Sequence, residues 1–178
     1  MEILFISPKE MVEDTMLGGN VDVDKYMPFI LQTQRKVVES LLGTELYDKM
    51  VTDYGNDISN GVFTPNNVSG DYLILLNDFI KPITKYESVA SYITVSPYSL
   101  GNSGIYKRTA DNKETVDYKE VERLSQFYSS IAQTDVGRFE KWIRIHPLLE
   151  YKTIQDEVNA SKNLNLNPTL QQYTWRKL

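Results

Sequence analysis

The chain of 178 residues has no cysteine and a single histidine. Without cysteine, disulfide bonds and thiolate metal sites are excluded, and a reducing compartment is permitted. His146 stands before Pro147 where a helix is predicted to end, which is typical of a capping or surface residue. One histidine and no cysteine do not provide the usual zinc ligand sets. No catalytic constellation is recognisable, so we expect no enzyme activity, no cofactor and no metal.

Basic charge and uninterrupted hydrophobic runs are also scarce. The 19 lysines and arginines are outnumbered by 24 aspartates and glutamates, and the net charge of −5 disfavours nucleic-acid binding over the whole surface. The apolar stretch 71–96 is interrupted by Asn77, Asp78 and Lys81, which disfavours a membrane span. Residues 1–6 are too short and too acidic for a secretory signal. We expect a soluble chain, made in the cytoplasm, with no membrane association.

The stretch 71–96 predicts the long helix around which the fold is organised. Its apolar residues recur at alternating spacings of four and three, which places them on one helical face. Three more apolar residues widen this face, as in helices at the centre of a bundle. Pro82 cannot donate a backbone hydrogen bond, so we expect a kink there. The predicted face consists of Tyr72, Leu76, Phe79, Ile83, Tyr86, Ala90 and Ile93, widened by Leu73, Ile80 and Val89.

Shorter helices are predicted before this stretch. Residues 2–6 form a β-prone run, after which Ser7 and Glu10 have the spacing of a capping box for a helix to about Thr15. A second helix should begin near residue 22 or 24 and end at Leu42, and a third should follow directly. The buried face of the second helix is predicted to comprise Met27, Ile30, Leu31, Val37, Val38 and Leu41.

A tight corner is predicted between the second and third helices. Gly43 should take a left-handed conformation at the end of the second helix, and Thr44 should cap the third. Residues 53–70 are polar and turn-rich, and we interpret them as a long loop, although Asn60-Gly61 is a hairpin-type signal. Asp53 and Asp57 in this loop lack the spacing of an EF-hand, so calcium binding is not predicted.

A β-hairpin is predicted after the central helix. Residues 100–104 form a turn with Asn102 and Gly104 as turn residues, and residues 105–109 alternate like a strand. The strand could pair with residues 93–97 or with another chain. Tyr106, Lys107 and Arg108 are predicted interface residues, and an aromatic beside basic residues could also touch nucleic acid.

A last long helix should run from residue 116 or 117 to His146, with a possible bend at Gly137. We predict a helical domain over residues 1–147 and a C-terminal arm over 148–178. Residues 149–158 could add one helix, and the apolar remainder is predicted to dock on a neighbouring subunit or partner. The helix face is predicted to comprise Tyr118, Val121, Leu124, Tyr128, Ile131, Phe139, Trp142 and Ile143; the arm contacts are Leu170, Tyr173, Trp175 and Arg176.

The packing and turn residues of the first two thirds resemble those of a known protein family. They are similar to the small helical head–tail connector, or adaptor, proteins of tailed bacteriophages of gut Bacteroidales, the crAss-like phages. The resemblance is carried by Pro28-Phe29-Ile30, Gln34, Leu41-Leu42-Gly43, Leu46-Tyr47, Leu73, Ile80-Lys81-Pro82, Tyr86 and Asn102-Ser103-Gly104-Ile105.

The resemblance implies a mainly α-helical subunit of a ring, commonly of twelve copies, in the virion at the head–tail interface. Such a ring contacts the portal protein and other tail or connector proteins, and DNA passes through its lumen without specific binding. An alternative is a small soluble helical module that binds one protein partner as a monomer or dimer, without catalytic activity.

Overall fold

The computed structural model describes residues 3–13, 15, 23–59, 62–101, 104–107 and 117–152. Helix accounts for 74% of the described residues, with a small antiparallel hairpin, so the predicted mainly α-helical fold is confirmed. The helices are α1 (Pro8–Glu13), α2 (Met27–Thr33), α3 (Glu39–Leu42), α4 (Thr44–Asn56), α5 (Asp71–Ile74), α6 (Lys81–Val95) and α7 (Tyr118–Ile145). A 3-10 turn, η1 (Val23–Lys25), and two π-helical segments, η2 (Gln34–Val38) and η3 (Leu75–Ile80), lie between them.

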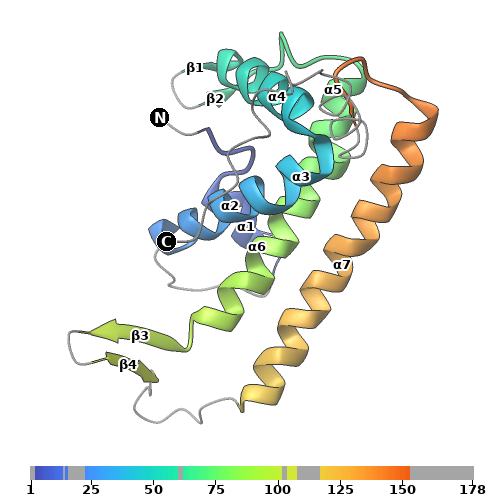
Figure 1. The fold of residues 1–178 in the computed structure, drawn as a ribbon. Helices are drawn as coiled ribbons and strands as arrows, with labels where there is room; N and C mark the ends of the chain where they lie inside the picture. The colour runs from blue at the N-terminus through green and yellow to red at the C-terminus, as the bar shows by residue number, and fades with distance from the viewer. Residues whose placement is uncertain are drawn as a thin grey trace, which may run out of the picture.

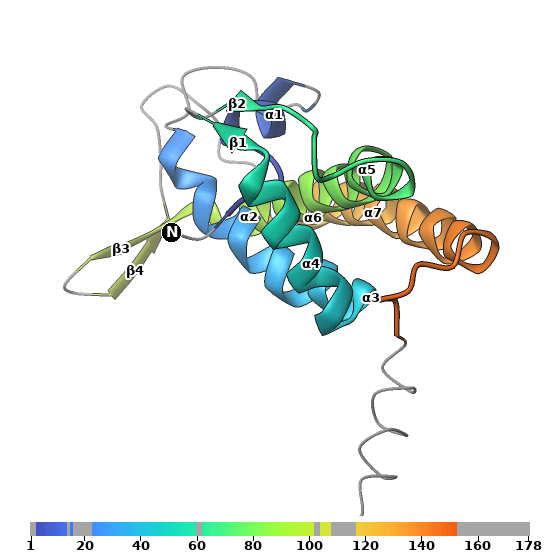
Figure 2. The same ribbon diagram turned by 90° about the horizontal axis from the view of Figure 1, so that it is seen from above.

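The central helix predicted over 71–96 is formed by α5, η3 and α6 in succession. Figure 1 shows it running diagonally through the molecule, with the 28-residue α7 along one side and α2, α3 and α4 on the other. Figure 2 shows α6 and α7 side by side again from above. Apolar side chains of the central helix therefore meet neighbours on two sides, as its wide apolar face predicts.

Two buried clusters fill the space between these helices. The larger lies around η3 and joins it to α4 and to the second half of α7; its members include Phe79, Leu46 and Phe139. The smaller joins α1, α2 and the second half of α6 to the first half of α7, and includes Tyr26 and Ile93. The central helix contributes to both clusters, so it holds the two halves of the molecule together.

Pro82 is accommodated by the wide turn that precedes it. The N–H of Lys81 donates to the carbonyl of Leu76, five residues back, and η3 ends there. Pro82 then occupies the first turn of α6, where a missing N–H is tolerated. The structure shows a π-helical segment before Pro82, in which the proline ring avoids a clash with the previous turn, and the kink expected there stays a prediction.

The corner at Gly43 has the positive φ of the predicted left-handed conformation, but its ψ differs from that of an αL cap. Its φ of 76° and ψ of 159° lie in a region that is open essentially to glycine alone. Thr44 does not cap the next helix, contrary to the prediction: α4 begins at Thr44 itself and Gly43 occupies the N-cap position. Gly43 alone makes the sharp change of chain direction, so Thr44 lies in the first turn of α4.

The N-terminal segment also differs from its prediction. Residues 3–6 are not a strand; instead, the buried Gln34 side chain binds this backbone. The N–H of Phe5 donates to Gln34 Oε1 at 2.9 Å, and Gln34 Nε2 donates to the carbonyl of Ile3 at 3.1 Å. The predicted capping box is confirmed, because the N–H of Ser7 donates to Glu10 Oε2 at 2.7 Å and the Glu10 N–H donates to Ser7 Oγ at 3.2 Å.

Two residues predicted to be buried are exposed. Met27 is 44% and Tyr118 is 61% exposed, and each is the first residue of its helix. Helical side chains lean toward the N-terminus and cover the preceding turn, which a first residue does not have. The bounds of α7 lie close to those predicted, because it ends before His146. It begins after a capping box of Asp117 and Glu120 that was not predicted. The further helix predicted over 149–158 is not present in residues 149–152.

The segment predicted as a long loop contains a short hairpin. β1 (Ile58–Ser59) pairs antiparallel with β2 (Val62–Phe63), on either side of the Asn60-Gly61 signal. The second hairpin was predicted, but its first strand lies later in the chain. β3 (Tyr98–Gly101) pairs with β4 (Gly104–Lys107), whereas residues 93–97 were one expected partner of this strand.

Candidate functional site

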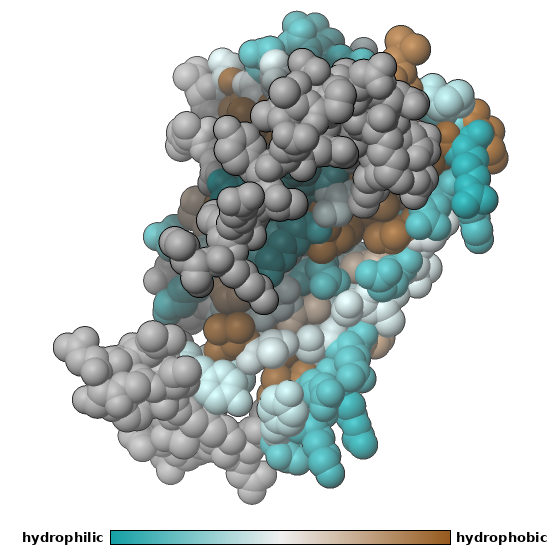
Figure 3. All heavy atoms as spheres, in the orientation of Figure 1, coloured by the Kyte–Doolittle hydropathy of each residue, from teal (hydrophilic) through white to brown (hydrophobic). Residues whose placement is uncertain are grey.

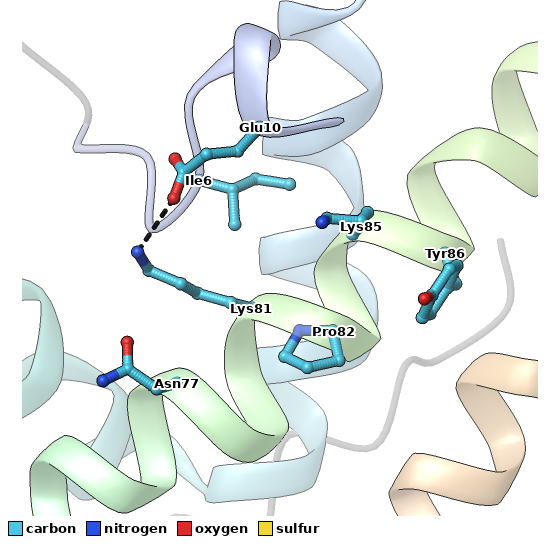
Figure 4. Close-up of a pocket in the computed structure, with 7 residues that line it drawn as sticks. All are labelled: Ile6, Glu10, Asn77, Lys81, Pro82, Lys85 and Tyr86. Carbon is cyan, nitrogen blue, oxygen red and sulfur yellow. Dashed lines mark hydrogen bonds and ion pairs between the residues drawn. The ribbon is translucent and has the colours of Figure 1, made fainter. Parts of the chain in front are cut away.

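A hollow of about 400 Å³ opens between the N-terminal segment and the central helix (Figure 4). An ion pair spans it, with Lys81 Nζ 2.9 Å from Glu10 Oε1. Figure 4 shows Lys81 extending toward Glu10, with Lys85 one turn further along α6. The hollow is lined by Ile6, Glu10, Asn77, Lys81, Pro82, Lys85 and Tyr86.

The Glu10 carboxylate in this hollow is engaged on both oxygens. Burial raises its pKa, but the hydrogen bonds from the Ser7 N–H and from Lys81 outweigh burial and leave the pKa below its usual value. Lys81 Nζ also lies 5.8 Å from the centre of the Phe63 ring. These contacts tie α1 and β2 to the central helix, so Glu10 and Lys81 serve the fold.

Asp57 is a second carboxylate with an internal role, and unlike Glu10 it is buried. Its oxygens accept hydrogen bonds of 2.8 to 3.0 Å from the backbone N–H groups of Asn66, Asn67 and Val68. The Asn67 side-chain amide donates a further bond of 2.8 Å. Burial raises the pKa of Asp57, but these donors outweigh it and lower the pKa to about 2. The carboxylate closes the segment from residue 57 to 68 and is already satisfied by protein donors.

No acidic or histidine cluster that could hold a metal ion is found within the described ranges. None of the helices in those ranges combines the length and hydrophobicity that a membrane span requires. His146 is exposed, and its ring stacks on Trp142 at 5.1 Å between ring centres.

A groove of about 330 Å³ runs over α6 between α2 and α7. Its lining is rich in hydroxyl groups and includes one carboxylate, Glu87, which accepts a hydrogen bond of 3.1 Å from Ser129 Oγ. Ser125 Oγ donates to the carbonyl of Ala90 at 3.0 Å. We call this the hydroxyl groove, and it is lined by Phe29, Gln32, Glu87, Ala90, Ser91, Thr94, Val95, Ser125 and Ser129.

The β3–β4 hairpin lies at the same end of α6 as the hydroxyl groove. Both ribbon views show it extending beyond the helical body (Figures 1 and 2). Within the described residues its sheet contains only these two strands, so each strand has one edge without a sheet neighbour. Exposed strand edges carry unpaired N–H and carbonyl groups that pair readily with another chain.

The structure describes some of the predicted interface residues and not others. Tyr106 and Lys107 lie in β4, and Gly104 pairs with Gly101 at the end of the hairpin. Gly43 and Pro82 are turn residues as described above. The others lie outside the described residues: Asn102, Arg108, Leu170, Tyr173, Trp175 and Arg176.

The first residues of the predicted C-terminal arm contact the helical domain itself. Leu148 and Tyr151 pack against the larger core cluster, and Tyr72 donates a hydrogen bond of 2.7 Å to Glu150. Leu149 between them is 93% exposed, and Ile145 at the end of α7 is 74% exposed. Figure 3 shows hydrophilic residues along the outer edge of α7 and hydrophobic ones at this end.

The comparisons with known proteins now place the chain in a family. Residues 38–157 match the family of unknown function DUF6712, which is about two thirds of the chain. The chain belongs to this family. No curated protein and no solved structure matches it. The DUF6712 region includes α4 to α7 and both hairpins, and therefore α6, over which the hydroxyl groove runs. It extends past the domain boundary predicted at residue 147.

Sequence reasoning missed the hydroxyl groove and the role of Asp57. The groove combines residues of three helices. The sequence of one helix does not indicate which part of its surface stays exposed after its neighbours have packed against it. A usable signal existed for Asp57, because an aspartate before a hairpin-type turn and an Asn-Asn pair is a frequent side-chain-to-backbone acceptor.

Proposed function

We propose that this chain is a structural subunit of a head–tail connector ring of a tailed bacteriophage. The ring would lie in the virion beneath the portal, having been made in the host cytoplasm, and DNA would pass through its lumen. The resemblance of the packing and turn residues suggests this role, and the family of unknown function leaves it open.

The observation that carries the proposal is the β3–β4 hairpin. Its four-residue strands extend beyond the helical body and have uncovered edges. An isolated two-stranded hairpin is marginally stable in water, and pairing or packing against a further surface stabilises it. A protein that presents such an element on a helical body is suited to repeated contact with copies of itself.

The test is the mass of the full chain in solution, alone and mixed with the portal protein of the same phage. We expect a closed oligomer by sedimentation velocity, with a central hole in negative-stain images. We also expect no binding of duplex DNA at physiological salt, because the net charge of −5 repels phosphates. A monomer under both conditions would refute the proposal.

A second candidate function is a small helical module that binds one protein partner. The observation that favours it is the pair of exposed apolar side chains at the end of α7, Ile145 and Leu149. Such residues at one corner suit a compact contact with a single partner. A monomer or dimer that forms a one-to-one complex through this corner, and loses it on Leu149→Asp, would support this function instead.

A further inference from the structure

We propose that the β3–β4 hairpin of one copy docks in the hydroxyl groove of the next copy. This inference rests on the proposed ring and names the surface by which its subunits join. It follows from three observations: the position of the hairpin, the chemistry of the groove, and the charges of the two elements.

The position of the hairpin points to a second copy as the occupant. Only Ser96 and Pro97 separate α6 from β3, and both ribbon views show the hairpin directed away from the helices (Figures 1 and 2). The groove lies along α6 before this point, between the walls formed by α2 and α7. A hairpin that continues outward from the end of α6 does not reach back into the groove of its own chain.

The groove presents hydrogen-bond acceptors. Ser125 Oγ and Thr94 Oγ1 lie 3.0 Å from the carbonyl of Ala90, to which each donates, and Ser129 Oγ donates to Glu87. The hydroxyl protons of Thr94, Ser125 and Ser129 are thus engaged inside the molecule. Ser125 Oγ also accepts from Thr94 Oγ1 at 3.1 Å, and each of the three oxygens retains at least one free lone pair. The edge of a β-strand carries backbone N–H donors at regular intervals beside its carbonyls, and these N–H groups match the acceptors of the lining.

The charges of the two elements are opposite. Glu87 is a charged residue of the groove, and none of the nine residues named above as its lining is a lysine or arginine. The only charged residue in the described strands of the hairpin is Lys107. Opposite charges on two docking surfaces favour the correct partner and register.

Docking of a hairpin into a different surface of the next copy is a head-to-tail contact. Such contacts are not self-complementary, so after one contact has formed the pair still offers one free hairpin and one free groove, on different subunits. Repetition closes a ring when the rotation between copies fits, which is the assembly that the proposed function requires.

The absence of native cysteine makes the inference directly testable by engineered disulfides. Ser91→Cys marks the groove, Ser99→Cys marks the hairpin, and Ser130→Cys on the exposed face of α7 is the matched control. Each full-length chain carries one substitution, and two chains are mixed and oxidised. We expect a cross-linked dimer from Ser91→Cys with Ser99→Cys, and at least tenfold less from Ser130→Cys with Ser99→Cys.

The double variant Ser91→Cys/Ser99→Cys should give a ladder of higher multiples under the same conditions. A charge exchange provides a second test: Glu87→Lys and Lys107→Glu should each weaken self-association about tenfold, and their combination should restore it. Oligomers that form without the groove–hairpin cross-link would overturn this inference and leave the ring standing. Absence of any oligomer would overturn both proposals.

Discussion

Phe79 is the residue whose truncation tests the packing of the central helix most directly. It lies in η3, is 5% exposed, and belongs to the larger core cluster. Its ring centre is 5.3 Å from that of Trp142 and 6.0 Å from that of Phe139, both on α7. The Arg138 guanidinium lies 5.7 Å from the same ring. Phe79 therefore joins the central helix to the second half of α7.

The expected cost of Phe79→Ala is about 3–5 kcal/mol of unfolding free energy. A buried phenylalanine leaves a cavity when truncated to alanine, and losses in this range are typical. The two aromatic contacts contribute roughly 0.5–1.5 kcal/mol each within that total. A loss of this size is a large part of the ~5–15 kcal/mol that stabilises an ordinary domain, so the urea midpoint should fall steeply.

The assay is urea unfolding followed by circular dichroism, with Phe127→Ala as the matched control. Phe127 is a phenylalanine on α7 that is 54% exposed, so its truncation should change the unfolding free energy by about 0.5 kcal/mol or less. Equal effects of the two substitutions, or a loss below about 1 kcal/mol at Phe79, would show that the assignment of the buried face is wrong.

Two further predictions concern the glycine corner and the Asp57 carboxylate. Gly43→Ala should lower the free energy of unfolding by about 1–3 kcal/mol, because alanine is strained at a φ of 76°. Gly137→Ala in α7, where an added Cβ meets nothing within 4 Å, should raise it by about 0.5–1 kcal/mol. Thermal unfolding of the two variants measures both changes, and changes of the same sign would contradict this account. Asp57→Asn should lower the unfolding midpoint at neutral pH. The folded pKa of about 2 lies below the ordinary 3.8, so the stability from the Asp57 charge is present above pH 3.8 and is lost as pH falls toward 2. A gap between the two proteins that stays constant over pH 2–5 would argue against the charge as its cause.

Features set by neighbouring residues were predictable from the sequence. Ser7 and Glu10 form their capping box, and Gly43 takes its positive φ, because each depends on a few adjacent residues. The central helix was predictable because its apolar period persists through Pro82. The π-helical turn was not, since it arises from the fit of the proline to the helix before it.

Features that depend on distant contacts escaped prediction. Gln34 interrupts an apolar helix face, yet it is fully buried, because it binds backbone 29 and 31 residues away. Asp57 similarly binds N–H groups up to 11 residues away. The groove of the candidate site depends on how three helices meet, so its residues look like ordinary polar positions in the sequence.

The Gln34 contact has a consequence for the order in which the molecule forms. The backbone at Phe5 gains its hydrogen bond only after Gln34 is in place, and the Phe5 ring packs edge-on against Tyr47 and Tyr54 of α4. During synthesis these residues leave the ribosome before their partners do, and contacts between residues far apart in the sequence form slowly. We expect the Phe5 amide to be among the last to gain protection in pulse-labelled refolding, and early protection there would contradict this order.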